Sequence, residues 1–66
     1  MQVTVNDAPH EVPDGTTVAQ LLERLDAPRA GVAVEVNRRI VRKADHAGTA
    51  LAAGDRVEIV TLVGGG

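Results

Sequence analysis

The sequence predicts an α+β domain in which a mixed sheet of four or five strands wraps around one helix. Short segments of alternating polar and apolar residues predict strands in both halves of the chain, and one amphipathic helix is expected between them. With 66 residues, the chain can hide only about 60% of the surface that its unfolded form exposes. We therefore expect one small domain, residues 1–63, followed by a flexible glycine tail at 64–66.

The N-terminal residues predict an antiparallel hairpin. Residues 2–6 alternate polar and apolar, and residues 10–12 form a second short strand that ends before Pro13. Turn-forming residues occupy positions 6–9 between them. The core face of this hairpin is expected to carry Val3, Val5 and Val12.

A helix is predicted over residues 18–26. Thr17 and Gln20 fit a capping box, in which each side chain bonds to the backbone N–H of the other residue. Pro28 disfavours helical backbone at the preceding residue, so the helix should end near Asp26. Apolar residues at helical spacing form one stripe for the core, namely Val18, Leu21, Leu22 and Leu25.

The second half of the chain predicts three further extended segments. A strand at 32–36, a turn at 37–39 and a short extended piece at 40–41 precede an irregular stretch at 42–53, which Leu51 should anchor. The longest strand is expected at 56–63. This order of elements resembles the β-grasp fold.

The last strand should present two unlike faces. Val57, Ile59 and Thr61 are expected to face the core. The opposite face becomes apolar toward the tail, and exposed apolar residues beside a functional segment suggest a docking surface. The residues assigned to partner docking are Glu58, Val60 and Leu62, although single exposed aliphatic residues are also ordinary on protein surfaces.

The three consecutive glycines at the end of the sequence are the main candidate for chemistry. At average glycine usage, such a run at a chosen position arises in only about 0.03% of chains. Gly64 and Gly65 carry no side chain, so they could thread into a narrow partner site, over roughly 10 Å for three residues. The carboxylate of Gly66 could then be activated by adenylation. A frayed end is the ordinary alternative.

Composition argues against most other activities. The chain has no Cys, Ser, Tyr, Trp or Phe, so thiol and serine nucleophiles and aromatic stacking platforms are absent. The net charge of −2 gives no basic field for nucleic acid or anionic lipid. His10 and His46 lack metal-ligand spacing. We expect a cytoplasmic protein, monomeric when free, that has no active site and binds no metal, cofactor, nucleic acid or membrane.

Several segments of the chain match the motifs of one known family. They are Val-Asn near the start, Val-Pro-Asp-Gly-Thr-Thr-Val at 12–18, Val-Glu-Val-Asn at 34–37, Ile-Val at 40–41, Gly-Asp-Arg-Val-Glu-Ile-Val at 54–60 and the final Gly-Gly. Together they resemble the ThiS family, the sulfur-carrier proteins of bacterial thiamin biosynthesis. The resemblance covers essentially the whole chain and departs from the family at residues 42–46, where many members carry a Pro-Arg-x-Glu-Trp-like segment.

The resemblance implies a ubiquitin-like carrier. A ubiquitin-activating-like enzyme would consume MgATP to adenylate Gly66. A sulfur donor, such as a cysteine desulfurase or a rhodanese-like protein, would then convert the adenylate to a thiocarboxylate. Thiazole synthase would take that sulfur for the thiazole of thiamin.

Other readings share the tail or the fold. They are the small subunit of molybdopterin synthase, a carrier for cysteine synthesis or tRNA thiolation, and a ubiquitin-like modifier ligated to lysines. A β-grasp interaction module with an inert tail is the remaining one, because a fold alone does not assign a function.

Overall fold

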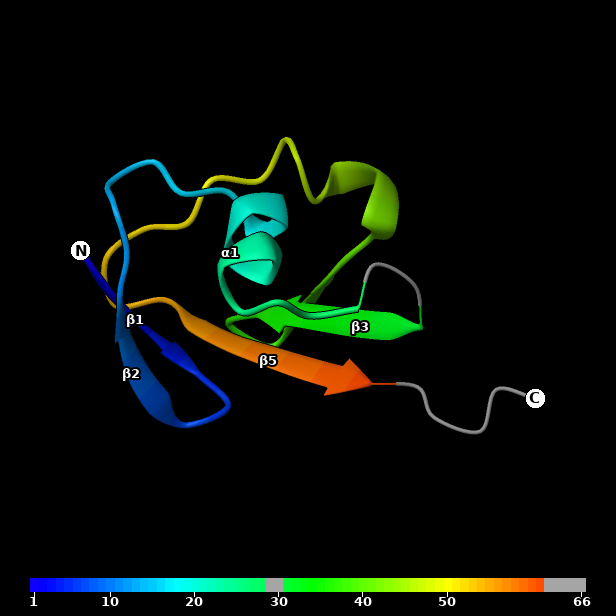
Figure 1. The fold of residues 1–66 in the computed structure, drawn as a ribbon, viewed down its shortest axis with the longest axis horizontal. Coiled ribbons are helices and arrows are strands. Elements are labelled where there is room, and N and C mark those ends of the chain that lie inside the picture. Colours follow the sequence, from blue (N-terminus) through cyan, green and yellow to red (C-terminus); the bar gives the residue numbers. More distant parts are fainter. Residues whose placement is uncertain (29–30, 62–66) are drawn as a thin grey trace.

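The computed structural model describes residues 1–28 and 31–61. In these residues a five-stranded sheet packs against one α-helix, α1 (Figure 1). The strands lie in the order β2-β1-β5-β3-β4; β1 and β5 are parallel, and the other neighbours are antiparallel. The elements are β1 (Gln2–Val5), β2 (Ala8–Glu11), α1 (Val18–Arg24), β3 (Val32–Val36), β4 (Arg39–Val41), the 3₁₀ helix η1 (Lys43–Asp45) and β5 (Arg56–Thr61). The predicted α+β fold with a mixed sheet and one α-helix is confirmed.

Both hairpins close through two-residue loops. The β1–β2 register pairs Val5 with Ala8, so the loop is residues 6–7, and the β3–β4 loop is residues 37–38. All four loop residues have positive φ, from 48° to 70°, which is the backbone that matches the right-handed twist of paired strands. The predicted turns at 6–9 and 37–39 were therefore too long. Pro9 is tolerated inside β2 because β2 is an edge strand.

Helix α1 begins as the sequence predicted and ends earlier. The Thr17 hydroxyl accepts the Gln20 N–H at 3.2 Å, and the Gln20 side chain accepts the Thr17 N–H at 2.9 Å, which confirms the capping box. The helix ends at Arg24 with Leu25 as its C-cap, and Asp26 has a φ of 55°. Because that left-handed backbone cannot continue a helix, the predicted end near Asp26 lay two residues too far.

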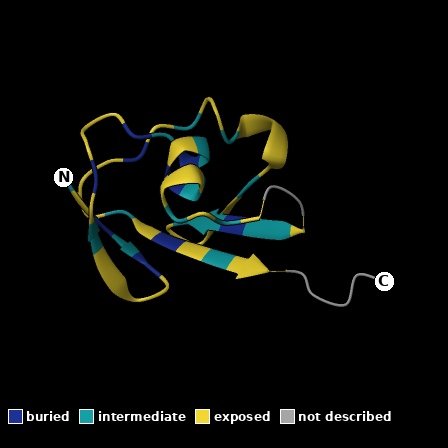
Figure 2. Ribbon diagram, in the orientation of Figure 1, coloured by how far each residue is buried: buried dark blue, intermediate teal, exposed yellow. Residues whose placement is uncertain are grey.

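The core lies between α1 and the sheet (Figure 2). Its buried hydrophobic residues are Val3, Val5, Val12, Val18, Leu21, Val34, Leu51 and Val57. Leu22 and Leu25, predicted as core residues, are half-buried and pack against this cluster. Thr61 lies on the predicted face, since it pairs with Val32 two residues after Ile59, but it is exposed and therefore is not a core residue, because β5 extends past the helix there.

The stretch between β4 and β5 is irregular, as expected, and contains η1. It is held across the start of α1 by main-chain hydrogen bonds from Val18 to Thr49 and from Leu51 to Thr16, at 2.9 and 2.8 Å. These bonds bring Leu51 into the core, where it is buried. No helix within residues 1–28 and 31–61 is long and apolar enough to span a membrane.

Two adjacent helix residues provide a test of this core. Leu21→Ala should lower the free energy of unfolding by about 2–5 kcal/mol, because Leu21 is fully buried and its loss leaves a cavity. Leu22→Ala, the matched control, should cost less because Leu22 is half-buried. Urea unfolding followed by far-ultraviolet circular dichroism measures both in a chain that lacks Trp and Tyr. Equal losses for the two variants would contradict the observed packing.

Candidate functional site

Strand β5 carries the described part of the predicted site. It lies between β1 and β3, and its last residue is Thr61. Leu62 and the tail glycines Gly64, Gly65 and Gly66 lie outside the described residues, as does the expected domain boundary after residue 63. Their predicted roles therefore stay predictions.

Two of the residues predicted to dock a partner, Glu58 and Val60, lie in the described part of the chain. Both are on the outer face of the sheet, which is turned away from α1. Val60 is 54% exposed and pairs with Ala33, while Glu58 is exposed and pairs with Glu35. Residues that pair directly across two strands, or lie two apart on one strand, share a face. Val60 and Glu58 thus lie side by side on the outer face, as the alternation of the sequence predicted.

Ile40 is an apolar member of this outer face that sequence reasoning missed. It is 73% exposed and pairs with Glu35, on the opposite side from Glu58. The three-residue strand β4 is too short to show an alternating pattern, so the sequence gave no period from which to assign a face. We call Ala33, Glu35, Ile40, Glu58 and Val60 the outer sheet surface.

The centre of the outer sheet surface is acidic. Glu35 and Glu58 are direct cross-strand neighbours, an arrangement in which like charges disfavour the sheet. A shallow groove of about 390 Å³ lies beside them and is also lined by Arg38 and Arg56. Arg56 points its guanidinium at Asp7, with an N–O distance of 3.1 Å. The surface therefore combines two carboxylates with exposed aliphatic side chains, and two arginines lie beside it.

The other residues considered from the sequence do not gather into a site. His10 and His46 are half-buried on different elements, and no group of three metal-ligating side chains occurs in the described part of the chain. The basic residues Arg38, Arg39, Arg42 and Lys43 are all exposed.

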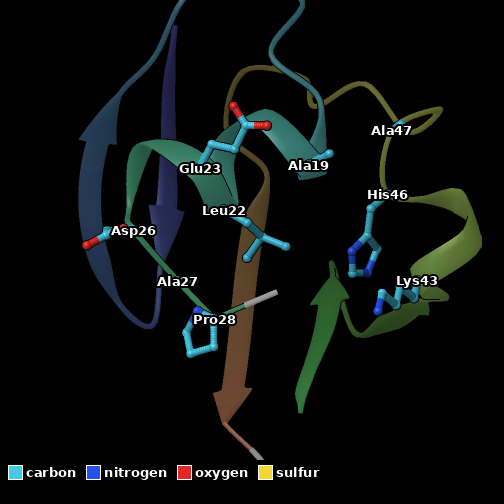
Figure 3. Close-up of a pocket in the computed structure, with 9 residues that line it drawn as sticks. All are labelled: Ala19, Leu22, Glu23, Asp26, Ala27, Pro28, Lys43, His46 and Ala47. Carbon is cyan, nitrogen blue, oxygen red and sulfur yellow. The ribbon is translucent and has the colours of Figure 1, made fainter. Parts of the chain in front are cut away.

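A second groove lies between the end of α1 and η1 (Figure 3). Its volume is about 450 Å³, with Leu22 and Glu23 on the helix side and Lys43 and His46 on the other. The Nε2 atom of His46 lies 3.1 Å from the Val41 carbonyl oxygen, so this nitrogen is occupied within the fold when it carries the proton. The wall mixes both charges with apolar groups and defines no particular ligand.

These features define the class of the protein: a ubiquitin-like β-grasp domain whose central strand leads to the glycine tail. The family follows from sequence comparison. The model of the ThiS family matches residues 2–66, and the chain belongs to that family. This membership confirms the prediction of a sulfur carrier of thiamin biosynthesis.

Individual relatives agree with the family assignment. The sulfur carrier protein ThiS of Escherichia coli is 35% identical over 66 residues, which is 100% of both chains. A crystal structure of the thiamine biosynthesis protein ThiS from Geobacter metallireducens matches with a TM-score of 0.86 and 33% identity, again over 100% of both chains. A thiazole synthase of Magnetococcus marinus is 35% identical over 66 residues, and there the chain spans only 20% of the relative.

Two valines of β5 test the assignment of its faces. Val57→Asp should unfold the domain or cost about 3–5 kcal/mol, because it places an unpaired charge in the core. Val60→Asp should cost about 1 kcal/mol or less, since the new carboxylate stays in water. Thermal unfolding of the two variants measures the difference. A loss at position 60 as large as that at 57 would place Val60 in the core.

Proposed function

We propose that the protein carries sulfur on the carboxylate of Gly66. A ubiquitin-activating-like enzyme would join this carboxylate to AMP from MgATP, with release of pyrophosphate. The terminal sulfur of a persulfide, carried by a cysteine desulfurase or a rhodanese-like protein, would displace AMP at the carbonyl carbon and form an acyl disulfide. A second thiol would cleave its S–S bond, which leaves the thiocarboxylate on the carrier and a disulfide on the donor. Thiazole synthase would take the sulfur, and the carrier would return as the carboxylate.

The chemistry of a terminal glycine supports this cycle. An α-carboxyl group is ionised at neutral pH, because its ordinary pKa is about 3.3–3.7, and it can attack a phosphorus atom. It is a poor electrophile until adenylated, which makes ATP necessary for the exchange of oxygen for sulfur. A glycine places no side chain beside the activated carbonyl. Gly64 and Gly65 similarly require only a passage wide enough for bare backbone.

The single observation that carries the proposal is the match of the ThiS family model through residue 66. The alignment with the E. coli sulfur carrier also covers the whole of both chains, so it includes residues 64–66 of this chain. Thiazole synthase is supported as a partner by a second observation. Two curated thiazole synthases contain a segment 35% and 38% identical to this chain, which spans 20% of each.

In this proposal the chain acts as a co-substrate, and its partners supply the catalytic groups. It would bind no cofactor of its own, since the MgATP is consumed in the site of the activating enzyme. It would be a monomer when free, and it would dock through Leu62 and through the outer sheet surface, which contains Glu58 and Val60. The exposed aliphatic residues of this surface suit a partner surface with apolar side chains.

Loss of the last residue tests the role of Gly66. With an activating enzyme, MgATP and sulfide, the intact mass of the wild type should rise by the exchange of one oxygen for one sulfur, with the change on Gly66 in fragment spectra. Deleting Gly66 retracts the carboxylate by about 3.3–3.6 Å. Because a misplacement of about 1 Å can cost 10²-fold, adenylation should fall at least 10²-fold.

The thermal stability of the deletion variant should match that of the wild type, which controls for folding. If a competent activating enzyme never adenylates the wild type, the result would contradict the proposal and favour an interaction module. Transfer of the activated chain to lysines would instead indicate a modifier. Transfer of its sulfur only to a molybdopterin, cysteine or tRNA pathway would identify another carrier.

A charge on the outer sheet surface tests docking. Val60→Asp should raise the KM for the carrier in the adenylation reaction about tenfold, because docking would have to cover an added carboxylate. Ala53→Asp is the matched control, since it adds the same charge at an exposed position before the start of β5. Steady-state pyrophosphate release measures both. Equal KM values for the two variants would show that the partner does not cover Val60.

A further inference from the structure

Strand β5 loses its strand partner on the β1 side before it ends. The parallel pairing of β1 with β5 joins Thr4 with Arg56 and Val5 with Val57. The chain then turns away through the left-handed residues Asn6 and Asp7 into β2. On its other side, β5 stays paired with β3 as far as Thr61.

The side chain of Asn6 continues the ladder where β1 stops. Its Oδ1 accepts the Ile59 N–H at 2.8 Å, and its Nδ2 donates to the Ile59 carbonyl oxygen at 3.1 Å. Its own main-chain N–H donates to Val57 at 2.9 Å. One residue thus bonds to two successive positions of β5 on the same edge, as the next residue of a parallel strand would.

The contact between Asn6 and Ile59 lies close to the segment that leads to Gly66. Ile59 is two residues before the last described residue and seven before Gly66. Seven residues of extended chain span at most roughly 23–25 Å. In the described residues, the bonds from Asn6 to Ile59 are the hydrogen bonds to β5 on the β1 side that lie nearest to this arm, because the pairing with β3 holds only the other edge of the strand. A shift of more than roughly 1 Å in the reacting group exceeds what positioned chemistry tolerates.

We propose that Asn6 is a positioning residue for the carrier reaction. Its carboxamide fixes the direction in which β5 leaves the sheet and thereby directs the carboxylate arm into the activating site. Asn6 is 53 residues distant from Ile59 in the sequence and touches no reacting atom. The inference rests on the function proposed above, because it assumes that the arm after β5 delivers the reacting group.

Asn37 provides a matched control at the other end of β5. It occupies the same place in the β3–β4 loop, with a φ of 52° against 48° for Asn6. Its Oδ1 accepts the Arg56 N–H at 3.0 Å, and its main-chain N–H donates to the Arg56 carbonyl oxygen at 2.7 Å. Both asparagines lie in the same kind of turn, and the Oδ1 atom of each accepts a main-chain N–H of β5. The Nδ2 of Asn37 donates to the Asp55 carboxylate at 3.0 Å instead of to the β5 backbone, and only Asn6 holds the end of β5 that leads to the tail.

The experiment compares Asn6→Gly with Asn37→Gly, since glycine keeps each left-handed turn and removes each carboxamide. With the activating enzyme and MgATP, Asn6→Gly should lower kcat for adenylation about tenfold and leave the KM for the carrier within about twofold. Asn37→Gly should leave both within about twofold. Amide hydrogen exchange should accelerate at Ile59 in the first variant and at Arg56 in the second.

Asn6→Asp is a second variant in case Asn6→Gly does not fold. It keeps the turn and the size of the side chain but places an oxygen opposite the Ile59 carbonyl, so kcat should again fall. The positioning role would be overturned if an Asn6 variant folds and shows faster amide exchange at Ile59 but keeps the kcat of the wild type. An equal loss of kcat in Asn37→Gly would overturn it too, by showing a general effect of stability. If the activating enzyme never adenylates the wild type, that result would instead refute the proposed function.

Discussion

The pairing of β5 with both of its neighbours is the constraint on which the rest of this structure depends. β5 joins an N-terminal hairpin to a second hairpin that is distant in sequence, through two parallel pairs with β1 and five antiparallel pairs with β3. Val57 contributes the buried side chain at this junction. A strand held from both sides is a firm base for the arm that is proposed to reach another protein, so the element that closes the sheet would also serve the proposed function.

The features predicted correctly from the sequence are those with a local cause. The capping box at Thr17 and Gln20 needs only four consecutive residues, and the stripe at Val18 and Leu21 follows the helical period. The burial of Val3 and the exposure of Val60 follow from alternation along a strand. The family motifs linked these elements to a carrier function, which the comparisons confirm.

The features that escaped prediction depend on distant residues. The exposure of Thr61 follows from where α1 ends over the sheet, and Ile40 belongs to a strand too short to show a period. Asn6 was assigned to a turn, correctly, but its carboxamide bonds Ile59 across 53 residues. No local pattern distinguishes an asparagine that only turns the chain from one that also holds a strand, because the backbone requirement is the same.

Stability and function place different demands on neighbouring residues of this small domain. Along β5, Val57 is buried beneath α1, whereas Glu58 and Val60 face water on the outer sheet surface. The pairing of Glu58 with Glu35 opposes like charges, so this position does not serve the stability of the isolated sheet. Under the docking role proposed above, this position would serve contact with a partner. A single strand can therefore hold the core together with one face and remain available to a partner with the other.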